Sequence, residues 1–118
     1  MDFVKNDNII HLKATDKFDE VVLQSKTPMI VDFYADWCGP CRKLTPIIEE
    51  RLAKHKNFKL VKVNVDECPE LSEKYEVSGI PYVMLIQDGK KVGDFTGGDE
   101  SALDKLIAQI TSEEKKKD

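Results

Sequence analysis

The chain has 118 residues, a formal net charge of −4, and a composition that is 41% hydrophobic and 34% charged. This length suits one domain with a single core. We predict that domain over residues 1–118, with an N-terminal lead at 1–7 and a solvated, frayed tail at 112–118. The acidic balance argues against a nucleic-acid binder, which is usually basic. No apolar stretch reaches the length of a membrane span.

The opening residues, 1–8, carry charges and no long apolar run. This pattern is not that of a secretory signal peptide, so we expect a cytoplasmic protein. Thiols stay reduced in the cytoplasm. Closely spaced cysteines there are more often catalytic or metal-binding than structural.

The first half of the chain is predicted to alternate strand and helix. Residues 8–12 form a short strand, and Thr15 or Asp16 then caps a helix. An apolar run rich in β-formers predicts a central strand over 29–34. From residue 39 to about 55 the apolar residues recur at helical spacing, which predicts a long amphipathic helix.

The second half begins with an alternating strand at 58–65 and a short helix at 69–75 that starts with proline. A buried strand at 82–86 and a return strand at 91–95 are separated by an Asp-Gly pair, which is typical of a hairpin turn. The helix predicted last runs over 99–110, where an aspartate can cap its N-terminus.

Two cysteines, Cys38 and Cys41, lie where the central strand gives way to the long helix. Gly39 permits a tight turn, and Pro40 is tolerated in a first helical turn. A thiol at a helix N-terminus faces unpaired N–H groups and the positive end of the dipole, which favour the thiolate. We therefore predict a pKa for Cys38 below the ordinary value of about 8.5.

The two cysteines are expected to divide the work of disulfide exchange. Cys38 should be the exposed nucleophile that attacks a target disulfide and forms a mixed disulfide. Cys41, one helical turn later, should be more buried. It can attack the Cys38 sulfur within the same molecule, releasing the reduced target and leaving a Cys38–Cys41 disulfide.

The sequence WCGPCR at 37–42, preceded by VDFYA at 31–35, resembles the active site of the thioredoxin family. Further landmarks in matching order and spacing are KVNVD at 62–66, GIP at 79–81 and FTG at 95–97, and the resemblance covers about residues 8–110. It implies an α/β thioredoxin fold with a central mixed five-stranded sheet, strand order 1-3-2-4-5, flanked by four helices. It also implies a protein-disulfide reductase that contributes to cell redox homeostasis.

Asp32 interrupts the apolar run of the central strand. A buried carboxylate below the cysteines would have a raised pKa, because desolvation disfavours its charged form. The resemblance implies that Asp32 removes the proton from Cys41. It also places Lys62 near Asp32, as possible support for that carboxylate.

Four residues are expected to contact the target protein. The resemblance implies a cis Ile80–Pro81 peptide bond, which would set the backbone of Ile80 beside the cysteines, where an extended target peptide can pair with it. Trp37 is expected to be a partly exposed ring beside the thiol, and Gly97 a flat wall opposite it. The bulk of the proline ring would also discourage metal capture.

Cys68 departs from the basic family pattern. It lies just before a proline at a helix entry, and is either a spare thiol or a regulatory site for oxidation or dimerisation. The chain offers one C-x-x-C pair and no second pair, so a zinc module using Cys38, Cys41, Cys68 and a histidine is a weak alternative. The remaining alternatives are an oxidase or isomerase of the same fold and a non-catalytic scaffold.

The resemblance implies that the dipeptide Gly39-Pro40 between the cysteines would tune the reduction potential and favour reduction over oxidation. By the resemblance, NADPH-dependent thioredoxin reductase would return the disulfide to the dithiol. The chain itself has no dinucleotide-binding glycine motif, so we expect no bound cofactor and no metal. The expected partners are this reductase and disulfide-containing proteins of peroxiredoxin type, and the protein is expected to act as a monomer.

Overall fold

Strands and helices alternate along the chain in the computed structural model, which describes residues 7–116. The elements are, in order, β1 (Ile9–Leu12), the 3₁₀ turn η1 (Thr15–Lys17), the π-helical segment η2 (Asp19–Leu23), β2 (Met29–Tyr34), α1 (Gly39–His55), β3 (Lys59–Asn64), α2 (Pro69–Lys74), β4 (Tyr82–Gln87), β5 (Lys90–Thr96) and α3 (Glu100–Lys116). The strand predicted at 29–34 and the helix predicted at 39–55 are both confirmed.

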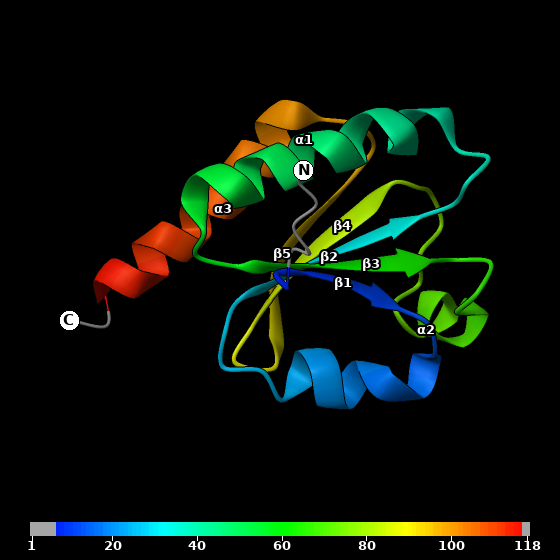
Figure 1. The fold of residues 1–118 in the computed structure, drawn as a ribbon, viewed down its shortest axis with the longest axis horizontal. Coiled ribbons are helices and arrows are strands. Elements are labelled where there is room, and N and C mark those ends of the chain that lie inside the picture. The colour runs from blue at the N-terminus through cyan, green and yellow to red at the C-terminus, as the bar shows by residue number, and fades with distance from the viewer. Residues whose placement is uncertain (1–6, 117–118) are drawn as a thin grey trace.

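The five strands form one sheet in the order β1-β3-β2-β4-β5, as the resemblance implied. Strand β3 pairs in parallel with both β1 and β2, whereas β4 is antiparallel to β2 and to β5. The helices lie on both faces of this sheet, with α1 and α3 on one side and η1, η2 and α2 on the other (Figure 1).

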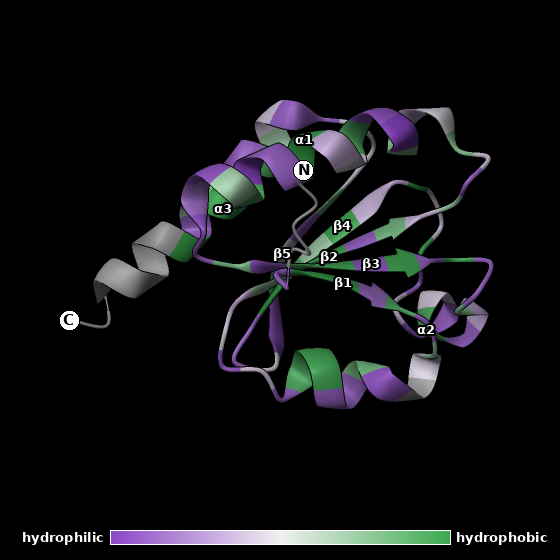
Figure 2. Cartoon of the chain, viewed as in Figure 1, coloured by the Kyte–Doolittle hydropathy of each residue, from purple (hydrophilic) through white to green (hydrophobic). Residues whose placement is uncertain are grey.

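Both faces of the central strands are therefore buried, which explains why β2 and β4 are almost continuously apolar. Successive residues of β2 point to opposite sides. Ile30 packs in the core below α1 and α3, whereas Val31 packs in the core on the other face. The strands carry many of the hydrophobic residues, while α1 and the coloured part of α3 mix hydrophobic and hydrophilic residues (Figure 2).

The β4–β5 hairpin turns at Asp88 and Gly89, which have positive φ angles of 55° and 80°. Two consecutive residues of positive φ are the signature of a type I′ turn, which suits the twist of the paired strands. The predicted Asp-Gly turn is thus confirmed. Farther along, the register shifts at Leu85/Ile86, where β5 carries one extra residue, Val92, as a β-bulge.

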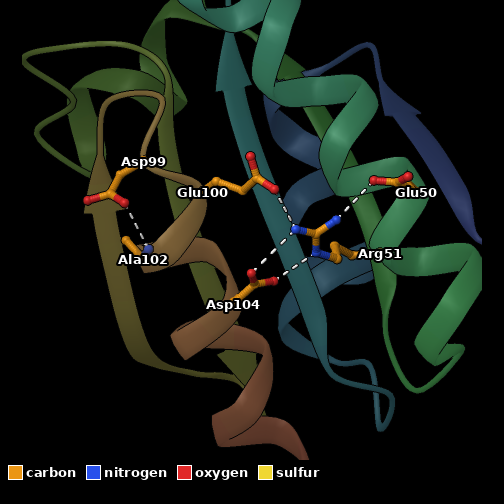
Figure 3. A network of polar contacts seen from close by, with 6 residues as sticks. All are labelled: Glu50, Arg51, Asp99, Glu100, Ala102 and Asp104. Atoms are coloured by element: carbon orange, nitrogen blue, oxygen red, sulfur yellow. Dashed lines mark hydrogen bonds and ion pairs between the residues drawn. The ribbon is translucent and has the colours of Figure 1, made fainter.

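A polar network joins α1 to α3 on the surface. Arg51 donates hydrogen bonds to Asp104 at 2.8 Å and to Glu100 at 2.7 Å (Figure 3). At the start of α3, Asp99 accepts a hydrogen bond from the backbone N–H of Ala102 at 3.0 Å. The predicted cap of α3 is therefore confirmed. The hydrogen bonds of Arg51 hold α1 to α3, in addition to the packing of the apolar face of α1.

Two local expectations are wrong. The first is a helix capped by Thr15 or Asp16. The segment after β1 is instead a 3₁₀ turn followed by a π-helical segment, with Ala14 at the N-cap position and no side-chain cap hydrogen bond. The β-branched Val21 and Val22 disfavour a regular helix in so short a segment.

The second wrong expectation concerns the C-terminus. Helix α3 continues to Lys116, well into the segment predicted as a frayed tail. Most residues of this segment are Glu and Lys, which are good helix formers. The last two residues of that tail, and residues 1–6 of the predicted lead, lie outside the described part. No helix within residues 7–116 is long and apolar enough to span a membrane.

Candidate active site

Cys38 and Cys41 are joined by a disulfide at the N-terminus of α1, with their Cα atoms 5.3 Å apart. Cys38 is the N-cap residue of this helix, and its sulfur accepts a hydrogen bond from the backbone N–H of Cys41 at 3.2 Å. Gly39 and Pro40 form the first helical turn between the two cysteines. This geometry places the Cys38 sulfur where the unpaired N–H groups and the helix dipole stabilise negative charge.

The prediction that Cys38 is exposed is wrong for this disulfide form of the protein. Cys38 is only 5% exposed, against 2% for Cys41. The two cysteines form a small apolar cluster with Ala35, and the partly buried Tyr34, Val65 and Ile80 pack against it. The predicted order of exposure therefore holds, but the difference between the two cysteines is small.

Asp32 lies on β2, fully buried, on the side of the sheet that faces α1. Its Oδ2 atom accepts a hydrogen bond of 2.6 Å from the hydroxyl of Thr45 on α1. Its Oδ1 atom has no hydrogen-bond partner within residues 7–116. Burial raises the pKa of Asp32 from 3.8 to about 6, although Thr45 and Lys62 act in the opposite direction. A buried carboxylate that titrates near neutral pH can accept a proton.

Lys62 is the register partner of Asp32 on β3. Its ammonium group pairs with Glu49 on α1 at 3.5 Å and lies 5.7 Å from the centre of the Tyr34 ring. The positive charge of Lys62 still lowers the pKa of Asp32. Lys62 is thus near Asp32, as expected, but it forms an ion pair with Glu49.

An open cleft of about 520 Å³ lies beside the second cysteine. Its lining includes Cys41, Thr45, Glu49 and Lys62. The cleft extends from Cys41 to the charged pair Glu49–Lys62, and Thr45 in its wall contacts Asp32.

The peptide bond between Ile80 and Pro81 is cis, as the resemblance implied. Ile80 packs against the cysteine cluster. The backbone N–H of Gly97 donates a hydrogen bond of 2.8 Å to the carbonyl of Pro81, so the end of β5 is tied to the cis-proline loop. Gly97 has a φ of 100°, and a Cβ built there would meet no atom within 4 Å. The backbone conformation, and not lack of room, therefore favours glycine at this position.

Trp37, next to Cys38, is 68% exposed, as predicted for a ring beside the thiol. Its indole Nε1–H donates a hydrogen bond of 3.0 Å to Asp66. The ring is therefore held at the surface beside the disulfide by a contact that the sequence pattern did not reveal. An exposed, oriented aromatic ring is a common anchor for a protein partner.

Cys68 is fully buried at the N-terminus of α2, on the opposite side of the sheet from α1. Burial raises the pKa of its thiol, which also lies 3.9 Å from the carbonyl oxygen of Leu12. Among the described side chains, no three His, Cys, Asp or Glu groups are arranged to hold a metal ion. The ligand set of the zinc alternative is therefore not assembled.

Sequence reasoning missed Thr45 and Glu49. Both lie on α1, Thr45 one turn after Cys41 and Glu49 one turn further. Residues four apart share one face of a helix. Polar residues on the stripe that runs from Cys41 toward the core were therefore the signal that these side chains face the site.

A cysteine pair at a helix N-terminus, with a buried carboxylate behind it and a cis-proline loop beside it, defines a thiol–disulfide oxidoreductase. The thioredoxin family model matches residues 9–112. A thioredoxin from Rickettsia bellii is 51% identical over 81 residues, which cover 66% of this chain and 76% of that protein. A probable thioredoxin-2 from Caenorhabditis elegans is 37% identical over 105 residues, covering 87% of this chain and 72% of that protein.

Solved structures of thioredoxins have the same fold as this chain. The structure of Fasciola hepatica thioredoxin superposes with a TM-score of 0.80 at 31% identity, over 86% of this chain and 98% of that one. The chain belongs to the thioredoxin family. Together with the Cys38–Cys41 disulfide, this membership identifies it as a protein-disulfide reductase that works by dithiol–disulfide exchange.

Proposed function

We propose that Cys38 is the attacking thiolate of this reductase and Cys41 the thiol that resolves the mixed disulfide. The observation that carries this division is the position of Cys38 as the N-cap of α1, where its sulfur accepts the Cys41 N–H. The same N–H groups and dipole that surround this sulfur would stabilise a thiolate in the reduced protein.

The exchange takes place in two balanced steps. The Cys38 thiolate attacks one sulfur of the target disulfide, and the other target sulfur leaves with the electron pair as a thiolate. Cys41 then loses its proton and attacks Cys38, so that the second target sulfur leaves as a thiolate. The target gains two electrons, and its two thiolates take up the proton given up by Cys41 and one proton from water. The enzyme ends with the Cys38–Cys41 disulfide.

Asp32 is the proposed acceptor of the Cys41 proton. It is buried on the side of the sheet below α1, and its pKa of about 6 leaves most of the carboxylate charged at neutral pH yet able to take a proton. Lys62 would support the charged form from the neighbouring strand, because its ammonium group lowers the pKa of Asp32.

The proposed target surface surrounds the disulfide. Trp37 offers an exposed ring on one side, and the cis Ile80–Pro81 loop with Gly97 offers backbone on the other. An extended target segment could pair with the Ile80 backbone as an added strand. The open space above Gly97 would let such a backbone approach closely.

We further propose that the protein carries electrons in the cytoplasm, from NADPH by way of thioredoxin reductase to disulfide-containing targets such as peroxiredoxins. No cofactor would bind to the chain itself, and Gly39-Pro40 would hold the redox poise on the reducing side. A reducing compartment is where such a dithiol is regenerated. Fractionation of the cells that make the protein, followed by immunoblotting, tests the compartment.

The decisive experiment is a turbidity assay of insulin disulfide reduction with the wild type, Cys38→Ser and Cys41→Ser. We expect Cys38→Ser to be inactive and Cys41→Ser to accumulate a mixed disulfide with insulin, visible on a non-reducing gel. Cys68→Ser is the matched control and should keep the wild-type rate. An active Cys38→Ser variant would refute the assignment, and a reduction potential in the range of strong oxidants would favour the oxidase alternative.

A further inference from the structure

The buried carboxylate of Asp32 has an uneven set of partners. Its Oδ2 atom receives the hydroxyl of Thr45 at 2.6 Å, a short distance for such a bond. Its Oδ1 atom is buried and has no hydrogen-bond partner within residues 7–116. One oxygen is therefore held by α1, and the other is left to accept a proton.

Lys62 is not the hydrogen-bond donor to Asp32. Although it faces Asp32 in the strand register, its ammonium group is paired with Glu49 at 3.5 Å and lies over the Tyr34 ring. Among the described residues, the hydroxyl of Thr45 is therefore the one donor that forms a hydrogen bond with the Asp32 carboxylate.

We propose that Thr45 is a positioning residue of the reductase: its hydroxyl holds Oδ2 of Asp32, so that Oδ1 is the oxygen that accepts the proton of Cys41. This inference rests on the proposed role of Asp32 as the base. Thr45 lies one helical turn after Cys41 on the same face of α1 and lines the same cleft, so the Asp32 carboxylate is held from the helix that carries Cys41.

The physical effect of Thr45 has two parts. A hydroxyl that donates to a carboxylate stabilises the charged form, which opposes the strong effect of burial and lowers the pKa of Asp32. The same bond fixes the rotation of the carboxyl group, which an apolar pocket alone would leave undefined. Thr45 thereby keeps Asp32 ionised and oriented at neutral pH.

Other charged groups also face Asp32. From β3 comes the ammonium of Lys62, and from α1 comes the carboxylate of Glu49. Val83, the register partner on β4, carries no charge. The substitution of Thr45 leaves all of these groups in place, so a change in titration can be assigned to the hydroxyl.

The test compares Thr45→Val, which keeps the shape and removes the hydroxyl, with Thr45→Ser, which keeps the hydroxyl. Ser72→Ala is the matched control, because Ser72 also donates its hydroxyl within a helix, but to the neutral carbonyl of Cys68. All variants are made in a Cys68→Ser background. In the oxidised protein, carboxyl ¹³C NMR gives the pKa of Asp32 directly.

The second measurement uses the reduced protein and a chromogenic aromatic disulfide in a stopped-flow instrument. The first coloured thiolate is released when Cys38 attacks, and the second when Cys41 resolves the mixed disulfide. We expect Thr45→Val to raise the pKa of Asp32 by about one pH unit and to move the pH midpoint of the second release upward by the same amount. Thr45→Ser should restore both, and Ser72→Ala should change neither.

The two proposals fail in different ways. An unchanged pKa of Asp32 in Thr45→Val overturns the positioning role of Thr45 and leaves the base role of Asp32 standing. A raised pKa with an unchanged pH midpoint of the second release overturns the base role, and the positioning role falls with it. If Thr45→Val shifts the pKa of Asp32 and the pH midpoint of the second release but Thr45→Ser does not restore them, the proposal is also overturned. The effect would then not come from the hydroxyl.

Discussion

Asp32 and Asp94 are carboxylates on opposite faces of the same sheet, and their pKa values move in opposite directions. Burial raises the pKa of Asp32 to about 6, whereas hydrogen bonds from Tyr82 and Lys91 lower the pKa of Asp94. Asp94 accepts the Tyr82 hydroxyl at 2.6 Å and the Lys91 ammonium at 3.0 Å. Asp32 has one neutral donor and one oxygen without a partner within residues 7–116.

The difference separates a carboxylate that stabilises the fold from one that is suited to chemistry. Asp94 is part of a complete polar cluster at the β4–β5 hairpin, and its charge is compensated. Asp32 is held charged at a cost to stability, because water is removed from it and no cation replaces that water directly. Incomplete partnering of a buried ionisable group is thus the feature that marks the active site here.

The largest expected effect is that of Asp32→Asn. Without its base, the second release in the stopped-flow assay should slow by about 100-fold or more at pH 7, while the first release is unchanged. The amide keeps the size of the side chain and can still accept from Thr45, so the fold is retained. Equal slowing of both releases would contradict the assignment.

Asp32→Asn should also stabilise the protein at neutral pH. Because the folded-state pKa is raised from 3.8 to about 6, the stability from proton binding is present below pH 3.8 and is lost as the pH rises through 6. At pH 8 the variant should have a free energy of unfolding higher by about 3 kcal/mol. Urea denaturation at pH 8 and pH 3.5 checks this, and an equal gain at both pH values would exclude the buried charge as its cause.

The change in the free energy of unfolding caused by Asp94→Asn should be opposite in sign to that of Asp32→Asn and smaller. Its lowered pKa means that Asp94 contributes stability above its ordinary pKa of 3.8, and that this contribution is lost as the pH falls through the lowered value. The variant should lose about 1 kcal/mol at pH 7, because the 41% exposure of the side chain screens the charged contacts. Urea denaturation measures the loss, and the second release should keep its wild-type rate. A variant as stable as the wild type would show that the cluster is not stabilising.

A still smaller change is expected at the surface network of Arg51 (Figure 3). Hydrogen bonds to Asp104 and Glu100 raise the pKa of Arg51, but its acidic partners are half exposed. Arg51→Met should lower the midpoint of thermal unfolding slightly at low salt and still less at 1 M salt. A loss independent of salt would indicate that the side chain acts by packing between α1 and α3.

The smallest expected quantity is the coupling between Asp32 and Asp94. The two residues lie on opposite faces and share no hydrogen-bond partner. The stability change of the double variant Asp32→Asn, Asp94→Asn should therefore equal the sum of the single changes within about 0.5 kcal/mol. A larger coupling, measured by urea denaturation of all four proteins, would mean that the sheet transmits charge effects between its faces.

Long periodic segments were predictable from the sequence. Strand β2 and helix α1 follow the prediction because an apolar run and a helical repeat each bury a whole face. The short segment at η1 and η2 was not predictable to the same degree, because a few residues between β1 and β2 adopt whatever geometry brings Phe18 and Val22 into the core. At the end of α3, local helix propensity extended the helix farther than its apolar face required.

The same contrast holds at the site. The cysteine motif and Asp32 are visible in the sequence, because their chemistry differs from that of their neighbours. The partners of those groups are not, because they depend on how α1 lies across β3. That packing turns Thr45 toward Asp32 and Glu49 toward Lys62. Cys38 is buried by its own apolar cluster, to a degree that its place in a turn did not suggest.

The bulge at Val92 has a consequence for how the protein behaves at high concentration. Strand β5 is an edge of the sheet, and an edge with regular geometry is a template for intermolecular strand addition and aggregation. The extra residue interrupts that regularity, and the exposed Lys90 and Lys91 place positive charge beside it. The other edge, β1, spans only four residues. Both edges of the sheet are therefore poor templates for the addition of another strand.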